Sequence, residues 1–161
     1  ATRAPLIIAA PGLKAGKSTS LSEHVDIFPT ICVLAGVPVP TQLHGKSLKP
    51  VMQNSKAVVK DFSMSQYPRK LSKEDMKKFG TESNKIMGYS MRTDKYRYTI
   101  WMNDFTTADT FSDKKVYAQE MYDYSKDPLE KENVFADKSY SKVAQEMHEK
   151  MISFFASQVK K

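Results

Sequence analysis

The chain has 161 residues, 40% of them hydrophobic and 11% aromatic, a composition that fits a folded domain and excludes a disordered chain. Lysine and arginine number 25 against 18 acidic residues, and the net charge of +7 favours polyanions such as sulfated sugars, nucleic acid or an acidic membrane surface, or simply a soluble basic surface. The single cysteine, Cys32, excludes an internal disulfide and any multi-cysteine metal site.

The first predicted element is a strand at residues 6–10. This unbroken apolar run lies between Pro5 and the Pro11-Gly12 pair, and such a run is typical of a strand buried on both faces of a sheet. A strand of this kind needs neighbours, and the sequence has no initiator Met or leader ahead of it. We therefore expect an upstream part of the protein to supply the rest of that sheet.

The second predicted element is a short helix in DIFPTICVLAG, residues 26–36. Asp26 can cap this helix, Pro29 is tolerated in its first turn, and Gly36 can end it. Apolar residues fall on nearly every side, which indicates a helix packed between layers in an α/β arrangement. Residues 27–43 carry no charge, but three prolines and a glycine interrupt them, so they do not predict a membrane-spanning helix.

The remainder of the chain is predicted to be α+β. Four segments combine β-branched or aromatic residues with partial alternation, which favours a four-stranded antiparallel sheet. These are Phe62–Gln66, Ile86–Arg92, Arg97–Met102 and Val116–Tyr124. A hairpin bend is expected at residues 93–95. The lysine-rich stretches 70–85 and 103–115 are expected to be surface loops.

A C-terminal helix is predicted after residue 139. Ser139 or Ser141 can serve as its cap. The residues with helical spacing form one apolar stripe that can cover the sheet, and they are Val143, Met147, Met151, Phe154 and Phe155.

Two long motifs carry a family resemblance. EHVDIFPTICVLAGVPVPTQLHGKSLKPVM, residues 23–52, resembles the sulfatase pattern V-D-x-x-P-T, then L-A-G, a Pro-rich loop and a G-x-S-L turn. EMYDYSKDPLEKENV, residues 120–134, resembles the ending E-L-Y-D-L-x-x-D-P-x-E-x-x-N of the same family. Within sulfatases, SQYPR and IMGYSMRTDKYRYTIWM are similar to the iduronate-2-sulfatase group and its bacterial relatives.

The resemblance implies the C-terminal part of a sulfuric ester hydrolase. Residues 1–50 would be the last strand and helix of an alkaline-phosphatase-like core, and residues 51–161 a subdomain of sheet plus helix that walls the substrate pocket. The implied substrate is a sulfated sugar of the glycosaminoglycan type, with a uronic acid favoured. Calcium and a formylglycine nucleophile are expected on the upstream N-terminal chain or domain, which is also the expected partner. The implied location is secreted, periplasmic or lysosomal.

The chain itself is expected to hold neither nucleophile nor metal ligands. Cys32 lies in CVLAG, without the Pro and Arg of the family's C/S-x-P/A-x-R maturation motif, in a helix where a thiol is usually inert. Asp26 is expected to be a helix cap, and Asp123 and Asp127 to lie at a strand-to-turn ending. We therefore expect the isolated chain to be catalytically inactive.

SQYPR, residues 65–69, provides the main candidate for substrate binding. Arg69 offers a rigid fork for a carboxylate or sulfate, while Gln66 and Tyr67 can bind sugar hydroxyls and stack on a sugar face. Pro68 is expected to stiffen a turn here. A structural alternative is that Arg69 pairs with a carboxylate or caps a strand end. The family resemblance implies that this segment lies near the substrate cleft.

The histidines and two other cations are weaker candidates. His44 stands in a turn where the family often has Asp, and it is the histidine that could face the active-site cleft. His24 and His148 are expected to be structural or exposed, with His148 on the polar side of the final helix. Lys85 and Arg92 are expected at the surface or in packing.

Two alternatives remain open from the sequence. The chain could belong to another hydrolase of the alkaline-phosphatase superfamily, because the core strand is more widely shared than the closing motif. It could also be a stand-alone basic module that binds heparin-like polymers or nucleic acid. Scattered loop lysines, rather than a concentrated basic patch interleaved with aromatics, disfavour a nucleic-acid partner.

Overall fold

The computed structural model describes residues 4–102 and 116–158. The chain separates into two compact units, Ala1–Ser63 and Met64–Lys161. No helix within the described ranges is long and apolar enough to cross a membrane. The assignment of residues 1–50 to a catalytic core and of 51–161 to a subdomain stays a prediction.

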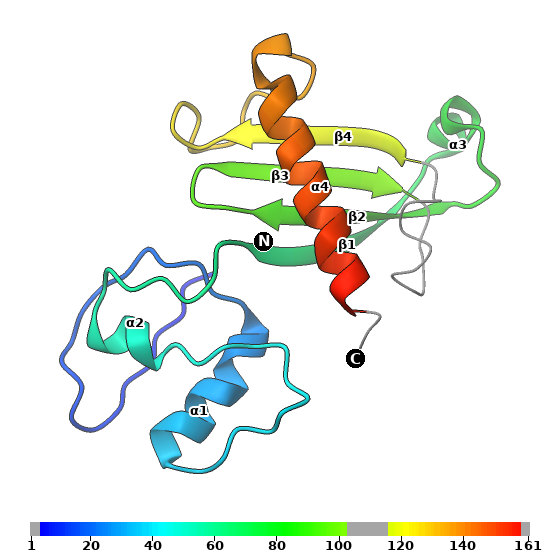
Figure 1. The fold of residues 1–161 in the computed structure, drawn as a ribbon. Helices are drawn as coiled ribbons and strands as arrows, with labels where there is room; N and C mark the ends of the chain where they lie inside the picture. The colour runs from blue at the N-terminus through cyan, green and yellow to red at the C-terminus, as the bar shows by residue number, and fades with distance from the viewer. Residues whose placement is uncertain (1–3, 103–115, 159–161) are drawn as a thin grey trace. The chain divides into compact units, whose positions relative to one another are not determined.

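The first unit contains the helix predicted near residue 30 (Figure 1). Helix α1, Ile27–Ala35, follows a short 3-10 turn, η1, His24–Asp26, and a second short helix, α2, spans Lys49–Gln53. Gly36 ends α1 in the left-handed conformation, φ 70°, where a residue without a Cβ is favoured. The prediction of this helix and of its stop signal is confirmed.

Asp26 stands at the expected cap position but binds elsewhere. Its carboxylate makes no capping bond to α1 and is fully buried. It accepts hydrogen bonds from the backbone N–H groups of Glu23 and Lys46, both at 2.8 Å, and it lies 2.7 Å from the Lys60 ammonium. The predicted side-chain cap is therefore wrong, because three other donors occupy both carboxylate oxygens.

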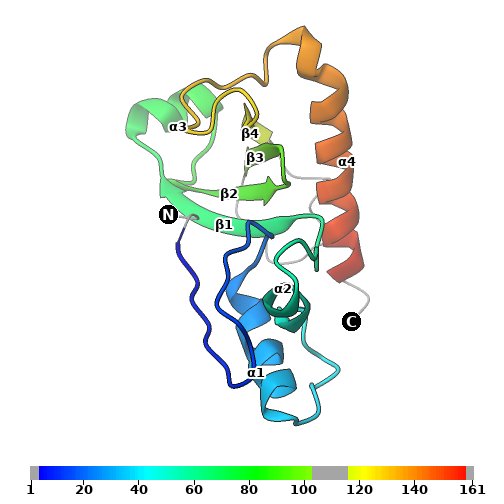
Figure 2. The ribbon, with the colours of Figure 1, turned by 90° about the vertical axis from the view of Figure 1, so that its left-hand side faces the viewer.

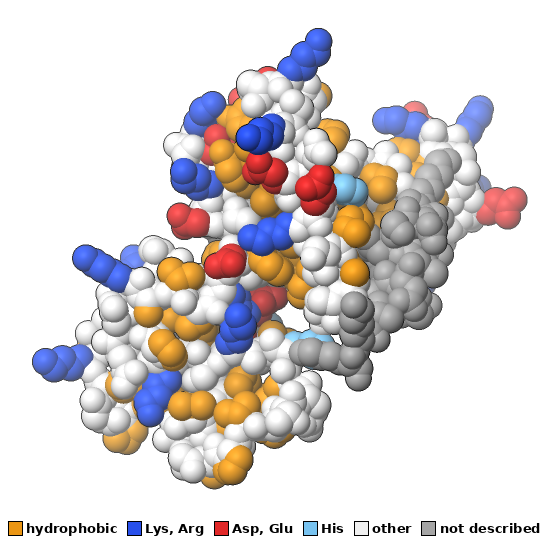
Figure 3. All heavy atoms as spheres, viewed as in Figure 1, with side chains coloured by type: hydrophobic (Ala, Val, Ile, Leu, Met, Phe, Trp, Pro, Cys, Tyr) orange, Lys and Arg blue, Asp and Glu red, His pale blue; other side chains and the backbone are white. Residues whose placement is uncertain are grey.

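The strand predicted at residues 6–10 is not formed in the structure. These residues have no regular secondary structure, and the side chains of Leu6 and Ile7 are 42% and 90% exposed. A strand requires a partner for its ladder of hydrogen bonds, and no described segment pairs with this run. Apolar side chains also lie at the surface in the region of α1, where Phe28 and Ile31 are about half exposed (Figure 3).

The second unit is a four-stranded sheet with a long C-terminal helix (Figures 1 and 2). The strands lie in the order β1-β2-β3-β4, with β3 antiparallel to both β2 and β4. Their bounds are β1 Ser63–Lys70, β2 Lys85–Arg92, β3 Tyr96–Met102 and β4 Val116–Asp123. The helices are α3 Lys73–Phe79, the 3-10 turn η3 Lys138–Tyr140 and α4 Ser141–Gln158. The fold prediction, sheet plus C-terminal helix, is confirmed.

The core of this unit lies between α4 and one face of the sheet (Figure 2). Alternation along β3 places Tyr98, Ile100 and Met102 on that face, and all three are fully buried. The helix side chains that are buried with them are Ala144, Met147 and Met151. Flexible methionines fill the irregular space between a twisted sheet and a helix. Of the predicted apolar stripe, Met147 and Met151 lie in this core, while Val143, Phe154 and Phe155 are only partly buried.

Two expectations about the connecting segments need correction. The stretch 70–85, expected to be a loop, contains α3, which starts where Ser72 Oγ accepts the backbone N–H of Asp75 at 3.0 Å and ends at Gly80. The cap before α4 is also different: Asp137 accepts the N–H of Ser139, and a 3-10 turn precedes the helix. The second expected loop, 103–115, lies outside the described residues.

Candidate functional site

SQYPR, the main candidate segment, forms part of β1 and not a turn. Residues 65–69 lie inside this strand, at the edge of the sheet. Pro68 is compatible with an edge position because one side of an edge strand needs no ladder hydrogen bonds. The expectation of a stiffened turn is therefore wrong, and the side chains of this segment follow the alternation of a strand.

The contact between Arg69 and Trp101 shows on which face of the sheet the Arg69 side chain lies. Its guanidinium carbon lies 5.8 Å from the ring centroid of Trp101, in β3. Trp101 belongs to the face opposite Tyr98 and Ile100, and hence opposite α4. Alternation directs Tyr67, which is 70% exposed, to the same face as Arg69. The same rule directs Gln66 to the other face.

Arg69 differs from the other two arginines of the sheet in its hydrogen bonding. Arg97 forms an ion pair with Glu130 at 2.5 Å, and the Arg92 side chain donates to the backbone carbonyls of Thr93 and Asp94. Arg69 is exposed and forms no ion pair or hydrogen bond with any other residue of 4–102 or 116–158. None of these described residues occupies its guanidinium donors.

A weaker charge interaction links Arg69 to the following helix. The hydrogen bond from Ser72 is the main cause that lowers the pKa of Asp75, and Arg69 adds a smaller Coulombic attraction. The charge of Arg69 thus attracts the Asp75 carboxylate, but the Arg69 guanidinium forms no hydrogen bond with it. The structural alternative, in which Arg69 is committed to a carboxylate, has no counterpart among the described residues.

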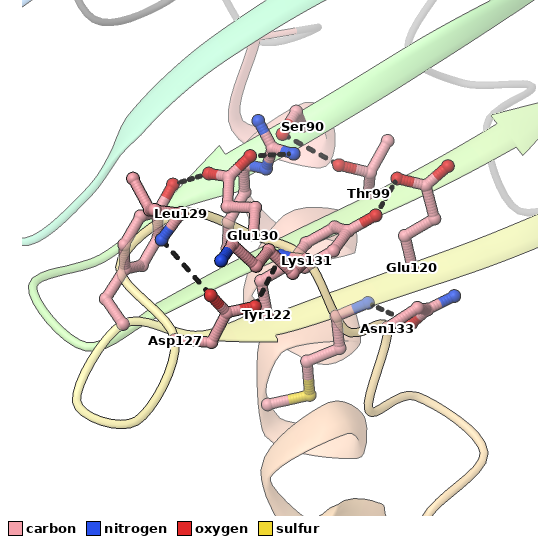
Figure 4. Close-up of polar contacts among 12 residues, drawn as sticks. Ser90, Thr99, Glu120, Tyr122, Asp127, Leu129, Glu130, Lys131 and Asn133 are labelled. Carbon is pink, nitrogen blue, oxygen red and sulfur yellow. Dashed lines mark hydrogen bonds and ion pairs between the residues drawn. The ribbon is translucent and has the colours of Figure 1, made fainter.

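A set of hydrogen-bonded side chains lies on the same face of the sheet as Arg69, and this face is here called the polar face. We define the polar face by Arg69, Ser90, Arg97, Thr99, Trp101, Glu120 and Tyr122. Trp101 Nε1 donates to Glu120 at 2.8 Å, and the Tyr122 hydroxyl donates to the other oxygen of Glu120 at 3.0 Å. Figure 4 shows Ser90, Thr99, Glu120 and Tyr122 side by side, with Thr99 donating to Ser90 at 2.8 Å.

The Tyr122 phenol of this network is protonated at neutral pH. Burial, and then the negative charge of Glu120, raise the pKa of the Tyr122 phenol to about 12. The hydroxyl therefore stays a donor to Glu120. Sequence reasoning missed Trp101 and Glu120, although Arg97, Thr99 and Trp101 alternate along a predicted strand and the chain contains no other tryptophan.

His44 lies in the first unit, on the segment between α1 and α2, and its side chain is exposed. Two hydrogen bonds hold the residues that follow it. Asp26 accepts the backbone N–H of Lys46, and Thr30 Oγ1 accepts that of Leu48, each at 2.8 Å. Gly45 is required by close packing, because a Cβ there would lie 1.9 Å from a backbone oxygen. The structure thus fixes the turn that carries His44.

His148 does not lie on the polar side of α4 as expected. Its Nδ1 lies 3.1 Å from the Tyr98 hydroxyl, which also accepts a hydrogen bond from Gln119 at 2.6 Å. His148 shares a helix face with the buried Ala144 and Met151, four residues before it and three after it. The prediction is wrong because that spacing turns the imidazole toward the sheet. The charged side chains of α4 all lie before Met151.

The remaining polar candidates are in structural roles. Cys32 is a free, buried thiol in α1. Asp127 accepts the backbone N–H groups of Leu129, Lys131 and Glu132, and these bonds lower its pKa. Within the described ranges, no group of three or more His, Cys, Asp or Glu side chains could hold a metal ion. The part of the chain that the structure describes therefore offers no such cluster of ligands for calcium.

Comparisons with known proteins match nearly the whole chain. Residues 1–157 match the family model described as N-sulphoglucosamine sulphohydrolase, C-terminal. N-acetylglucosamine-6-O-sulfatase of Bacteroides thetaiotaomicron is 33% identical over 90% of this chain and 23% of its own length. Iduronate 2-sulfatase of Mus musculus is 32% identical over 86% of this chain and 29% of its own length.

A solved structure gives the corresponding match in three dimensions. It is described as a complex with its substrate, D-glucosamine-2-N,6-O-disulfate, and it matches with a TM-score of 0.63 and 27% identity. The match covers 89% of this chain and 25% of that one. The chain thus spans about a quarter of the length of the proteins it matches.

Proposed function

The chain belongs to the sulfatase family and matches the C-terminal domain of that family. On this premise we propose that it is part of an enzyme that hydrolyses sulfate esters of a sulfated sugar. We further propose a 2-sulfated uronic acid of the iduronate type as substrate. The similarity to mouse iduronate 2-sulfatase and the SQYPR segment support this choice. A secreted, periplasmic or lysosomal location is proposed on the family resemblance alone.

In this proposal the chain supplies a wall of the substrate pocket, with Arg69 as its anion-binding group. The observation that carries it is the exposed Arg69 guanidinium over Trp101, without an ion-pair partner among the described residues. A guanidinium binds a carboxylate or a sulfate through two parallel N–H bonds. Tyr67 lies on the same side of β1 and can stack on the sugar. The roles proposed for Gln66, which alternation directs to the other face of β1, and for His44, in the first unit, stay separate predictions.

The chemical step is assigned to a part of the protein outside this chain. Cys32 is buried in α1, and the described residues contain no cluster of metal ligands. We therefore assign no part of the chemical step to the Cys32 thiol or to a metal held by these residues. We propose that calcium and a formylglycine nucleophile belong to an upstream sulfatase domain, which is also the partner that covers the exposed apolar side chains of α1. The bound calcium would supply the metal and the modified residue the nucleophile for sulfate ester cleavage.

The test of this function replaces Arg69 in the full-length protein. Arg69→Ala removes a charge-assisted contact worth about 1.5 to 3 kcal/mol, so kcat/KM for a 2-sulfated uronide should fall about ten- to a hundredfold. A small aryl sulfate lacks the uronic carboxylate and should lose less. Arg69→Lys should restore only part of the activity, because an ammonium cannot reproduce the fork.

The neighbouring Lys70→Ala is the matched control, since it removes an exposed cation whose side chain alternation directs to the other face of β1. It should leave both substrates unaffected. Equal losses on both substrates in Arg69→Ala, together with a lower melting temperature, would contradict a substrate-binding role and assign Arg69 to the fold.

A further inference from the structure

Trp101 is held in one orientation by contacts on two sides. Its indole N–H donates to Glu120 Oε1 at 2.8 Å. The second oxygen of Glu120 accepts the Tyr122 hydroxyl at 3.0 Å, so both carboxylate oxygens are occupied and the carboxylate cannot turn away freely. Because Glu120 and Tyr122 lie on the strand next to Trp101, they fix the indole from the β4 side.

Gly88 provides the seat for the ring on the β2 side. Gly88 pairs directly with Trp101 across the β2–β3 ladder. A Cβ at Gly88 would lie 2.7 to 3.0 Å from three carbons of the six-membered ring, closer than side chains pack. The indole therefore rests on the strand backbone, at a position where any other residue would displace it. Gly88, Trp101 and Glu120 together are called the Trp101 seat.

The ring held by this seat is the surface against which Arg69 lies. An arginine side chain has several rotatable bonds, and ordering it on binding carries an entropic cost. A fixed aromatic face within cation–π distance restricts the guanidinium before a ligand arrives. The 5.8 Å separation between the Arg69 guanidinium carbon and the ring centroid lies within that distance.

We propose that Trp101 is the positioning residue for Arg69, and that the Trp101 seat sets the affinity of the enzyme for its anionic sugar. This inference rests on the proposed function of Arg69 as an anion-binding group. Trp101 does not need to touch the substrate. Its effect is to hold the guanidinium on the polar face of the sheet, where the exposed Tyr67 also points.

The experiment is a double-mutant cycle in the full-length protein with Trp101→Leu, Arg69→Ala and the double variant. We measure kcat and KM on a 2-sulfated uronide and on 4-nitrophenyl sulfate. Trp101→Leu should raise KM for the uronide about two- to fivefold, the range expected for a cation–π contact at an exposed site, with kcat nearly unchanged. It should have no further effect when Arg69 is already alanine. Trp101→Phe keeps a ring and should recover part of the loss.

A second variant and a control keep the test decisive. Glu120→Gln leaves the strands intact but weakens the acceptor of the indole N–H, so it should also raise KM for the uronide. It serves as the test if Trp101→Leu fails to fold. Phe154→Leu shortens a half-buried aromatic of α4, on the other side of the sheet, and should leave KM unchanged.

The outcomes separate this inference from the function on which it rests. Suppose that Arg69→Ala lowers activity on the uronide. An unchanged KM in both Trp101→Leu and Glu120→Gln then overturns the positioning role alone, and so do losses that add in the double variant. No effect of Arg69→Ala, or no turnover of either substrate, overturns the proposed function and this inference with it.

Discussion

Asp123 joins the end of β4 to η3 through a carboxylate that is only 4% exposed. It accepts the Ser125 N–H at 2.9 Å and the Tyr140 hydroxyl at 3.0 Å. Lys126 donates to the same hydroxyl at 2.8 Å, which directs the Tyr140 proton toward Asp123. Burial acts to raise the pKa of Asp123, but the hydrogen bonds from Ser125 and Tyr140 outweigh it and leave the pKa lowered.

The lowered pKa makes the contribution of Asp123 depend on pH in a definite direction. A carboxylate whose folded-state pKa lies below its unfolded value stabilises the fold fully above the unfolded pKa, and this stabilisation is lost as the pH falls through the folded pKa. The ordinary value for Asp123 is 3.8, so the contribution is complete at neutral pH and decreases only below about pH 4.

We therefore predict a pH-dependent effect of Tyr140→Phe. Removing a hydrogen bond to a buried carboxylate should lower the free energy of unfolding by about 1.5 kcal/mol at pH 7, and the difference from the parent protein should shrink below about pH 4. Urea unfolding at pH 7 and pH 3 measures it. Tyr67→Phe, at an exposed position, is the control. A deficit that stays the same at both pH values would show that the hydroxyl does not act through the ionised Asp123.

Single-residue predictions failed where a side chain binds a partner that is distant in the sequence. Asp26 reads as a local helix cap, but two of its partners come from Lys46 and Lys60. His148 reads as a polar helix residue, but its partner is Tyr98, 50 residues earlier. Local capping and helix-face rules contain no information about such contacts, because the tertiary fold brings the partners together.

At the scale of elements, the packing of Trp101 in the β2–β3 ladder requires a residue without a Cβ at position 88, and this can be tested. Gly88→Ala places a methyl group 2.7 Å from the Trp101 ring, so the ring or the strand must shift. We expect a loss of about 1 to 3 kcal/mol in the free energy of unfolding, the usual cost of overpacking. Gly16→Ala is the matched control, because nothing lies within 4 Å of a Cβ there, and it should change stability by less than about 0.5 kcal/mol. Equal unfolding free energies for the two variants would contradict the Trp101 seat.

The sequence predicted the elements whose signals are local. Helix α1, strands β2 to β4 and the bend at residues 93–95 were all expected, because caps, alternation and turn residues act over a few positions. Helix α3 was missed although Ser72 followed by Asp75 three residues later, and then Gly80, is a start and stop signal. The lysine-rich composition of that stretch was given more weight than its capping pattern.

The candidate site was predictable only in part. Motif and side-chain chemistry singled out Gln66, Tyr67 and Arg69, but the predicted strand ended at Gln66, and the turn expected at Pro68 hid the face on which Tyr67 and Arg69 lie. Once the segment is a strand, alternation groups Tyr67 with Arg69 and separates Gln66 from them. The role of Trp101 depends on cross-strand register, which a sequence pattern alone does not specify.

At the scale of the whole molecule, the first unit exposes apolar side chains that a larger protein would cover. Ile7 is 90% exposed, and Phe28 and Ile31 in α1 are 54% and 55% exposed. The chain also spans about a quarter of the length of the sulfatases it matches. Both observations agree with the proposed upstream sulfatase domain.

The most direct test of the central claim measures inorganic sulfate released by the full-length protein from a disaccharide that carries a 2-sulfated uronic acid. We predict sulfate release by the full-length protein and none by the 161-residue chain alone. Replacing the Cys or Ser of an upstream C/S-x-P/A-x-R motif by Ala should abolish it, because formylglycine could no longer form. Absence of sulfate release from this and other sulfated sugars, or release that survives that substitution, would contradict the assignment of this chain to a sulfated-sugar sulfatase.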